Sequence, residues 1–387
     1  MSEAGRDSIP FGRPWITDED RQAVIAVLDG PILTHGPRCD EFEEAFSTFI
    51  GGGHSVTTSS CTAAMHLFYM HLGVGPGDEV ILPAISHVAT AHALEITGAR
   101  PVFVDCDADT GTMDPDLLER AVTPATRALC LVHFNGIPAD MTRITAVSAK
   151  HDLKVLEDCA TALGACWDGT HVGLFGDGAA FSFYPAKHIT AGEGGMFCSR
   201  HADVTASIRG MRAFCYDRSL NERALPGIYD VDGLGLNYRM SEMQAALGLS
   251  QLRRIRRILE IRAGNSSALK ERLGGIEGVR LLESRDRRGA DGHYCLTVML
   301  EGGLAARRDD MLARLKEEDI GTSVHYPHPL PRLRYYREKY GYDAARYPNA
   351  TAISDRSLNL PVAPHVDEAA IDRIGDVFNR LVRNLRE

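Results

Sequence analysis

Apolar residues change their spacing several times along the chain. They recur at helical spacing over residues 15–28 and 38–50, and a Thr-Ser-Ser-Cys-Thr segment at 58–62 has the form of a helix start. Short apolar runs and helical patterns then alternate. The candidate strands cover residues 79–82, 100–104, 128–132, 154–157, 178–182 and 195–198, and the candidate helices cover 87–98, 115–122 and 141–151. This alternation predicts an α/β fold with a mainly parallel sheet that is covered by helices on both faces.

The pattern changes after about residue 240. One long helical pattern covers about 241–273, and we expect strands near 293–300 and 321–325 and a closing helix over 367–385. A single core rarely serves more than about 300 residues, and this chain has 387. We therefore expect a large domain over 1–250, which includes the N-terminal helices, and a smaller C-terminal α+β domain over 251–387. The long helix would connect the two domains.

Composition narrows the class of protein. The net charge is −10 and there is no basic run, which argues against a nucleic-acid partner. No window approaches the roughly 18 apolar residues of a membrane helix, and residues 1–10 lack the apolar core of a signal peptide. The nine cysteines form no Cys-x-x-Cys pair, so we expect no metal site. These features predict a cytoplasmic globular protein with reduced thiols and no membrane partner.

One lysine has an unusual setting. Lys187 lies in the stretch 181–196, FSFYPAKHITAGEGGM, among aromatic, small and glycine residues. A buried lysine is costly unless it is paired, neutral or used chemically. Desolvation lowers the pKa of an amine and makes it a nucleophile toward carbonyl groups, which is what a Schiff-base lysine requires. The alternative is an ordinary surface lysine on a turn after a strand.

Three further polar signals fall where parallel strands are predicted to end, the edge at which such sheets bind ligands. The helix start at 60–63, with the Ser60 and Thr62 hydroxyls, offers free N–H groups to a phosphate, or it is a plain N-cap. Asp158 closes an apolar strand, and either holds a protonated pyridine nitrogen or caps the next helix. His87 either stacks on an aromatic cofactor or is a partly buried structural residue. With Lys187, this order of groups matches fold type I enzymes that use pyridoxal 5′-phosphate.

Sequence motifs connect these residues to a known family. The motifs are Thr34-His35-Gly36-Pro37, residues 59–67 (SSCTAAMHL), residues 77–81 (GDEVI), residues 101–105 (PVFVD), residues 157–160 (EDCA), residues 181–187 (FSFYPAK), residues 192–195 (GEGG), residues 237–242 (NYRMSE) and residues 324–327 (VHYP). Over nearly its full length the chain resembles the DegT/StrS family of sugar aminotransferases. The resemblance implies the fold type I architecture, a mainly parallel sheet flanked by helices with a smaller C-terminal domain.

The resemblance also implies roles in cofactor binding. Lys187 resembles the lysine that forms the Schiff base with pyridoxal 5′-phosphate and moves the proton during catalysis, and Asp158 resembles the carboxylate on the ring nitrogen. The remaining cofactor-binding residues implied are Ser60, Cys61, Thr62, His87, Ser182 and Asn237. Asn237 matches an asparagine that reaches the cofactor phosphate of the neighbouring subunit, which implies a homodimer with shared active sites. A local turn role is the alternative for Asn237.

The family's usual reaction implies the substrates. L-glutamate would donate its amino group, the cofactor would pass through its pyridoxamine 5′-phosphate form, and a ketone of a nucleotide-linked deoxysugar would accept the group. The residues that we expect to bind substrate are Tyr184, Glu193, Arg212, Tyr216, Arg239, His325 and Tyr326, with Arg212 and Tyr216 on a mobile loop over 211–229. Structural alternatives remain for two of them: a salt bridge for Arg239 and a turn-fixing role for Glu193.

Some positions depart from the family pattern. Cys61 stands where the family often has glycine, Thr161 where many members have a cofactor-contacting glutamine, and Tyr184 where histidine is common. The setting of Lys187 and His188 also resembles a 3-dehydratase branch in which histidine replaces the lysine. Because this chain keeps Lys187, we expect an aminotransferase. The alternatives are a transaminase for a cyclitol ketone or a free higher-sugar-acid carbonyl, and a sugar dehydratase.

Overall fold

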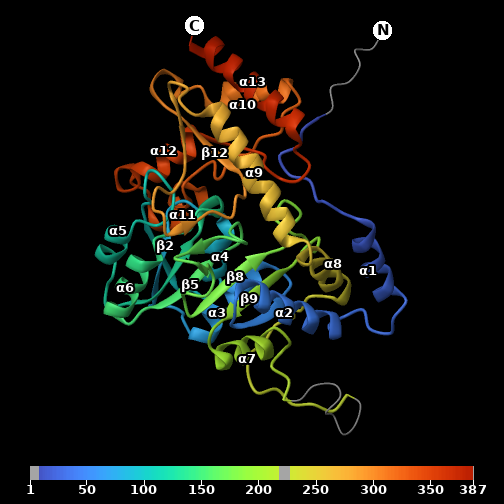
Figure 1. The fold of residues 1–387 in the computed structure, drawn as a ribbon. Helices are drawn as coiled ribbons and strands as arrows, with labels where there is room; N and C mark the ends of the chain where they lie inside the picture. Colours follow the sequence, from blue (N-terminus) through green and yellow to red (C-terminus); the bar gives the residue numbers. More distant parts are fainter. Residues whose placement is uncertain (1–7, 218–226, 387) are drawn as a thin grey trace.

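A central seven-stranded sheet forms the larger part of the molecule in the computed structural model, which describes residues 8–217 and 227–386 (Figure 1). The strand order is β1-β9-β8-β5-β4-β2-β3, and the strands are β1 (His54–Thr58), β2 (Glu79–Pro83), β3 (Arg100–Val104), β4 (Thr126–Val132), β5 (Lys154–Asp158), β8 (Gly178–Ser182) and β9 (Gly195–Ser199). Only β9 runs against its neighbours, β8 and β1. The predicted, mainly parallel sheet is therefore confirmed, with β1 as a strand that the sequence analysis missed.

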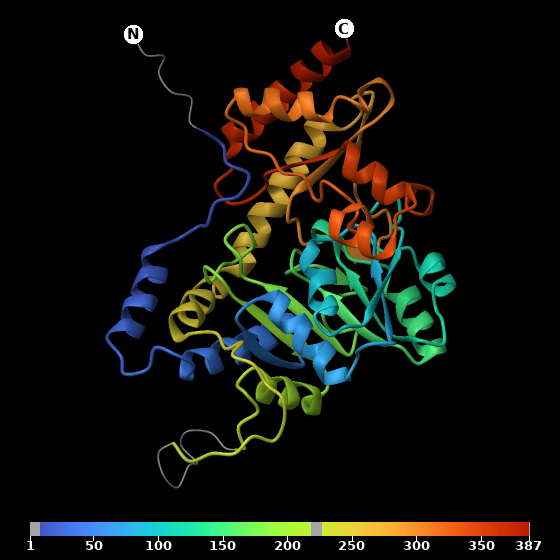
Figure 2. The same cartoon turned by 180° about the vertical axis from the view of Figure 1, so that it is seen from behind.

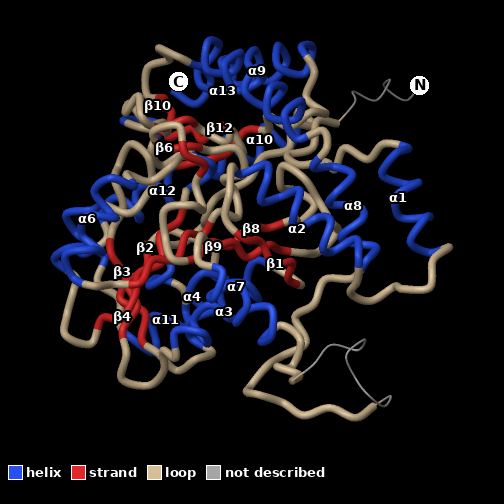
Figure 3. Tube along the Cα trace, turned by 60° about the horizontal axis from the view of Figure 1, so that its bottom comes forward, coloured by secondary structure: helices blue, strands red, loops and turns tan. Residues whose placement is uncertain are grey.

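Helices cover both faces of this sheet (Figure 3). One face packs against α3 (Cys61–Leu72), α4 (Val88–Glu95) and α7 (Ala202–Met211). The other face packs against α2 (Pro37–Ile50), α8 (Glu242–Leu252), α5 (Pro115–Arg120) and α6 (Met141–His151). Strands that are covered on both sides are apolar along their length: in β4, Thr-Arg-Ala-Leu-Cys-Leu-Val, every residue except Arg127 is buried.

A second, smaller unit lies above the sheet in Figures 1 and 2. It has a three-stranded antiparallel sheet, β10 (Val279–Leu281), β12 (Leu296–Leu300) and β13 (Ser357–Leu360). Its helices are α9 (Ile255–Leu273), α10 (Arg308–Glu317), α12 (Pro348–Arg356) and α13 (Glu368–Arg386), whereas α11 (Arg334–Tyr340) packs through Tyr336 against α4 and β3 of the larger unit. Ile9, near the N-terminus, packs into the same core as α9 and α13. A domain boundary at residue 250 stays a prediction.

Three short strands and one helix complete the fold. β6 (Cys166–Trp167), β7 (Thr170–His171) and β11 (Gly289–Ala290) form a small separate sheet. The N-terminal helix α1 (Asp18–Leu28) packs on α8. No helix in the described ranges combines the length and the apolar character that crossing a bilayer requires.

The prediction of one helix over 241–273 is wrong. The chain forms α8 and then α9, with Arg253 and Arg254 between them. Asp20 of α1 lies beside this break, where it is fully buried and accepts hydrogen bonds from Ser250 Oγ (2.7 Å) and from the Arg254 guanidinium (2.8 and 3.0 Å). A buried carboxylate needs such partners, and these bonds hold α1 against the junction of α8 and α9.

The strand predicted near 321–325 is also wrong. In this segment Ser323 makes only an isolated bridge to Asn359, on the edge of β13 that faces away from β12. The segment instead lies against the N-terminal chain: a Cβ at Gly321 would lie 2.5 Å from the backbone nitrogen of Phe11. The strand predicted near 293–300 is present over its second half, as β12.

Gly195 offers a test of how closely the sheet approaches α3. A Cβ at this position would lie 2.3 Å from the carbonyl carbon of Ser60 and 2.4 Å from the nitrogen of Cys61. We predict that Gly195→Ala lowers the free energy of unfolding by about 1–3 kcal/mol, because backbone must move to admit the methyl group. Urea denaturation measures this change.

Gly264→Ala is the matched control. Gly264 lies inside α9 with open space around its Cα, so alanine should stabilise the protein by about 0.5–1 kcal/mol. Equal effects of the two substitutions would contradict the close approach of Gly195 in β9 to the start of α3.

Candidate active site

The predicted cofactor residues come from several elements that end at one edge of the sheet. Asp158 is the last residue of β5 and pairs in register with Ala180 of the neighbouring β8, which ends at Ser182. Cys61 begins α3 soon after β1, and His87 follows β2 as the N-cap of α4. Carboxyl ends of parallel strands meet at the same edge, so side chains distant in sequence are brought together there.

The start of α3 has unused hydrogen-bond donors. Ser60 is the N-cap, and its hydroxyl accepts a hydrogen bond from the backbone nitrogen of Ala63 at 3.0 Å. In the part of the chain that the structure describes, the N–H groups of Cys61 and Thr62 donate to no protein acceptor. Free N–H groups at the positive end of a helix suit a phosphate. The helix start is therefore both the plain N-cap and a group that fits an anion.

Asp158 is buried, and both of its carboxylate oxygens are fixed. Thr90 Oγ1 donates to Oδ2 at 2.7 Å, and the backbone nitrogen of Ala160 donates to Oδ1 at 3.0 Å. The Cys61 thiol lies 4.0 Å from Oδ1. Thr90 was not predicted as a site residue. Its position in the first turn of α4, three residues after His87, is the signal that could have identified it.

Lys187 lies in the loop after β8 and is partly buried. Burial lowers the pKa of its amine, and the thiol of Cys61 and the carboxylate of Asp158 oppose this shift. Within the described ranges the amine makes no salt bridge, and its Nζ lies over the Tyr294 ring, 4.9 Å from the ring centroid. An amine without a counterion, at the edge where Asp158 also lies, fits a lysine that reacts with an aldehyde.

His87, His325 and Tyr326 form an aromatic wall beside these groups. The His87 ring lies edge-on to Tyr326, with 5.6 Å between the centroids, and the tilted His325 ring lies 5.4 Å from that of Tyr326. Burial lowers the pKa of His325 to about 3, so this imidazole is neutral at pH 7. Asn135 Oδ1 lies 2.9 Å from its Nδ1, and Ser323 Oγ lies 3.1 Å from its Nε2.

Arg212 does not lie with the other predicted substrate residues. Its guanidinium is buried and forms a salt bridge to Glu43 at 2.7 Å. It also donates to the carbonyl of Thr57 at 2.6 Å and to His35 Nε2 at 2.8 Å. These bonds join α7 to α2 and β1. Arg212 is thus occupied inside the protein, which is not what we expected of a loop residue that binds substrate.

Residues 218–226 of the loop predicted over 211–229 lie outside the described ranges, and the described segments on either side, 213–217 and 227–237, form a hairpin that begins after α7 (Figure 1). Isolated bridges pair Ala213 with Asn237 and Tyr216 with Val231. Tyr216 packs against Tyr229, with 4.6 Å between the ring centroids. Arg239 lies over the Phe214 ring at 5.5 Å.

The base of the hairpin touches the start of α3. The carbonyl of Tyr238 accepts a hydrogen bond from the nitrogen of Ser59 at 2.7 Å, so the segment 237–240 lies beside the predicted phosphate site. The Asn237 side chain is exposed there. Tyr184 and Glu193 are exposed in the same β8–β9 loop as Lys187, and the Glu193 carbonyl accepts a hydrogen bond from Gln244 Nε2 at 2.8 Å.

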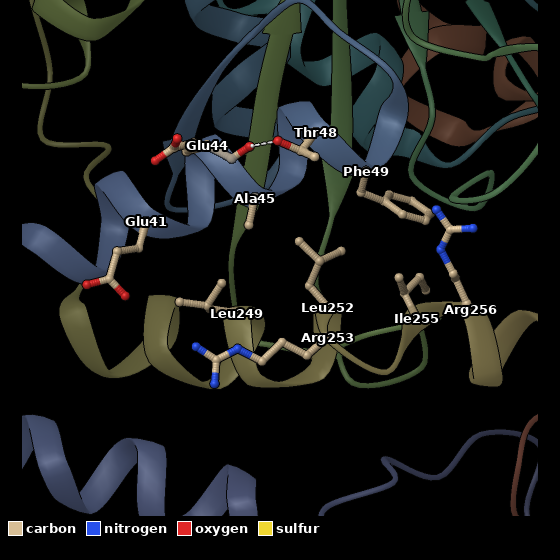
Figure 4. A pocket seen from close by; sticks show the side chains of 10 residues that line it. All are labelled: Glu41, Glu44, Ala45, Thr48, Phe49, Leu249, Leu252, Arg253, Ile255 and Arg256. Atoms are coloured by element: carbon tan, nitrogen blue, oxygen red, sulfur yellow. Dashed lines mark hydrogen bonds between the residues drawn. The ribbon is translucent and has the colours of Figure 1, made fainter.

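Two other features lie apart from these residues. His133, Glu157 and Cys159 form a buried group with metal-binding side chains, but the Glu157 carboxylate already accepts hydrogen bonds from the backbone nitrogens of Gly173, Phe175 and Gly176 and contacts His133 Nε2 at 3.0 Å. A surface groove of about 550 Å³ lies between α2 and the α8–α9 junction (Figure 4). None of the predicted site residues lines this groove.

Comparison with known proteins identifies the family. Residues 14–379 match the DegT/DnrJ/EryC1/StrS aminotransferase family. The chain belongs to this family. Among curated members of similar sequence, the spore coat polysaccharide biosynthesis protein SpsC of Bacillus subtilis (strain 168) is 37% identical over 385 residues, which is 97% of each chain.

Solved structures of similar proteins have the same architecture. The putative sugar aminotransferase Spr1654 of Streptococcus pneumoniae in its PMP form superposes with a TM-score of 0.92 at 28% identity, over 97% of this chain and 100% of that one. The same protein is also known in a PLP form. DesV of S. venezuelae in complex with a ketimine intermediate gives 0.87 at 31% identity, over 94% of each chain.

Membership of the DegT/StrS family confirms three predictions: the resemblance itself, the fold type I architecture and the aminotransferase class of enzyme. The predicted cofactor, pyridoxal 5′-phosphate, is confirmed at the level of the family. The residues present fit this group, because open N–H donors, a fixed carboxylate and an amine without a counterion occur at one sheet edge.

The buried Arg212–Glu43 pair leads to a stability prediction. Arg212→Met removes one of the two arginines that pair with the buried Glu43, and we predict a loss of about 1.5–3 kcal/mol in the free energy of unfolding, measured by urea denaturation. Arg209→Met is the control, because Arg209 also pairs with Glu43 at 2.7 Å but its side chain is 47% exposed. If Arg212→Met kept full stability and weakened only substrate binding, the prediction from the sequence that Arg212 binds substrate would be correct.

Proposed function

We propose that this enzyme moves the amino group of L-glutamate, through pyridoxal 5′-phosphate, to a ketone of a nucleotide-linked deoxysugar. The observation that carries the proposal is Lys187, whose partly buried amine has no counterion among the described residues and whose pKa burial lowers. The family, and similarity to solved sugar aminotransferases, support a sugar as acceptor. That L-glutamate is the donor, and that the acceptor sugar carries a nucleotide, are the more specific parts of the proposal.

Each protein group has a role in this chemistry. When bound, pyridoxal 5′-phosphate supplies an aldehyde that captures amines and a ring that withdraws electrons from the adjoining carbon. The lowered pKa of Lys187 increases the uncharged fraction of an amine that can bond to the aldehyde and later move a proton. Asp158, held by Thr90, would accept a hydrogen bond from the protonated ring nitrogen, and the N–H groups of Cys61 and Thr62 would bind the phosphate.

The acceptor would bind on the open side of Lys187. Tyr184 is 51% exposed, and the carboxylate of Glu193 is also exposed nearby in sequence. Arg239, at the base of the hairpin, would bind a diphosphate with two parallel hydrogen bonds. His325 and Tyr326 would shape the pocket, since the imidazole is neutral and enclosed. Arg212 has no part in the revised proposal, because its donors are used by Glu43, Thr57 and His35.

The proposal includes a homodimer with shared active sites. Asn237 is exposed beside the start of α3, a place from which an amide can reach a second subunit. It also includes a cytoplasmic location. All nine cysteines are free thiols, which is the state that a reducing compartment maintains.

Lys187→His tests the proposed role of the lysine. Histidine lacks the primary amine that exchanges with amino-group donors, so we predict loss of glutamate-dependent transamination by at least about 10³-fold. Cofactor binding should remain, because Asp158 and the α3 start are untouched. Stopped-flow spectra with glutamate and dialysis against cofactor measure the two properties. Transamination at the wild-type rate by this variant would rule out the proposal.

A panel of acceptors separates the candidate substrates. With glutamate as donor, the proposal predicts turnover of keto-sugar nucleotides and little turnover of cyclitol ketones or free sugar acids. The reverse preference would favour the cyclitol alternative, and loss of water without amine transfer would favour the dehydratase alternative.

Subunit mixing tests the shared site. Lys187→Ala and Asn237→Ala should each be nearly inactive alone. If Asn237 serves the neighbouring subunit, a mixed dimer holds one complete site, and random mixing should restore roughly a quarter of the wild-type activity. Restoration should be absent when two Lys187→Ala preparations are mixed. If Asn237 instead acts within its own subunit, mixing restores nothing beyond the sum of the two variants.

A further inference from the structure

The ring that lies over Lys187 is itself tightly held. Tyr294 is 6% exposed, and its ring centroid lies 4.9 Å from the Lys187 Nζ. Three other rings surround it: His325 is stacked at 5.5 Å, His188 lies at 5.9 Å and Phe11 lies edge-on at 6.4 Å. Tyr294 immediately precedes Cys295 and the smaller unit's central strand, β12. None of this was expected from the sequence, where Tyr294 belonged to a predicted strand.

A buried arginine holds the backbone of this tyrosine. Arg262 of α9 is 3% exposed and, among the described residues, forms no salt bridge. Its guanidinium donates to the carbonyls of Tyr294 (3.0 Å), His293 (3.4 Å) and Lys187 (3.5 Å). Burial lowers its pKa only to about 10, so the group is still charged at neutral pH. Burying a charge without a counterion is unfavourable, so these three carbonyls are the main compensation.

His188 binds the backbone of Gly292, two residues before Tyr294. Its Nε2 lies 2.7 Å from the carbonyl of Gly292, and because a carbonyl only accepts, Nε2 carries the proton. Burial and the charge of Arg262 lower the pKa of His188 well below its usual range, so the ring is a neutral donor. His188 and Arg262 together bind the carbonyls of three consecutive residues, 292–294.

The segment needs such support because its backbone is strained. His293 has φ of +52°, a left-handed conformation that a residue with a side chain adopts at a cost. This turn directs the Tyr294 ring toward Lys187. Without its bonds to Arg262 and His188, the segment would be free to relax and carry the ring away from the amine.

We propose that Arg262 and His188 are positioning residues that hold Tyr294 over Lys187, so that the ring excludes water from the amine. The inference rests on the proposed function for Lys187, and it deepens that function by naming what keeps the amine reactive. It also gives His188 a role as a neutral backbone anchor, distinct from proton transfer.

The test measures the free-amine fraction of Lys187 in cofactor-free protein. Trace acetylation over a pH series, followed by mass spectrometry of the peptide that contains Lys187, reports this fraction. We expect Arg262→Met and Tyr294→Ala each to reduce the free-amine fraction at pH 7 by roughly tenfold, because water then solvates the ammonium form. Arg262→Lys should restore part of the loss, and Tyr294→Phe should retain the wild-type value.

Arg256→Met is the matched control, an exposed arginine of the same helix that lines the surface groove (Figure 4). His188→Leu and His188→Gln provide a second pair if Arg262→Met does not fold: leucine should reduce the free-amine fraction, and glutamine, which keeps a donor, should not. The ring face also attracts the ammonium form. An unchanged or larger free-amine fraction in Tyr294→Ala would therefore overturn the proposal.

An unchanged fraction in both Arg262→Met and His188→Leu, with reduced stability only, would show a purely structural role and would also overturn it. Because the measurement needs no cofactor, its result is separate from that of the proposed function. A wild-type protein that takes up no pyridoxal 5′-phosphate would contradict the proposed function. The acetylation result would still show whether Arg262 and His188 position Tyr294 over Lys187.

Discussion

The fold of this enzyme partly buries one amine in the loop that follows β8 of its central sheet. Lys187 has no carboxylate partner among the described residues, and burial shifts its pKa downward. The other groups of the site depend on that placement. Asp158 lies close enough to moderate the shift without forming an ion pair, and the aromatic wall of His325 and Tyr326 closes one side. An ordinary salt bridge to Lys187 would remove the property on which amine transfer depends.

Much of the site could be predicted from the sequence, because it lies in segments whose local pattern determines their geometry. An apolar run that ends in Asp158 predicts a strand end, and Ser60 before a helical pattern predicts an N-cap with free N–H groups. Parallel strands then bring such ends to one edge. The same logic predicted six of the seven strands of the large sheet; β1, His-Ser-Val-Thr-Thr, was missed because its polar residues give no apolar run.

What the sequence could not reveal depends on partners far along the chain. Arg212 precedes a loop, so its burial against Glu43, 169 residues away, leaves no local signal. Arg254, between α8 and α9, pairs with Asp20 of the N-terminal helix, and the backbone around Tyr294 is bound by Arg262 and His188. In each case a buried charge or a strained turn is satisfied by a residue from another element, and spacing within one segment carries no record of it.

Borohydride reduction of the holoenzyme tests the central claim most directly, because it fixes a lysine–cofactor imine as a stable amine that survives digestion. The account predicts one modified peptide, with the phosphopyridoxyl group on Lys187, in about one copy per chain. Prior incubation with glutamate should abolish the labelling, since the cofactor then carries the amino group itself. Labelling of a different lysine, or a holoenzyme that binds the cofactor without any reducible bond to Lys187, would contradict the account.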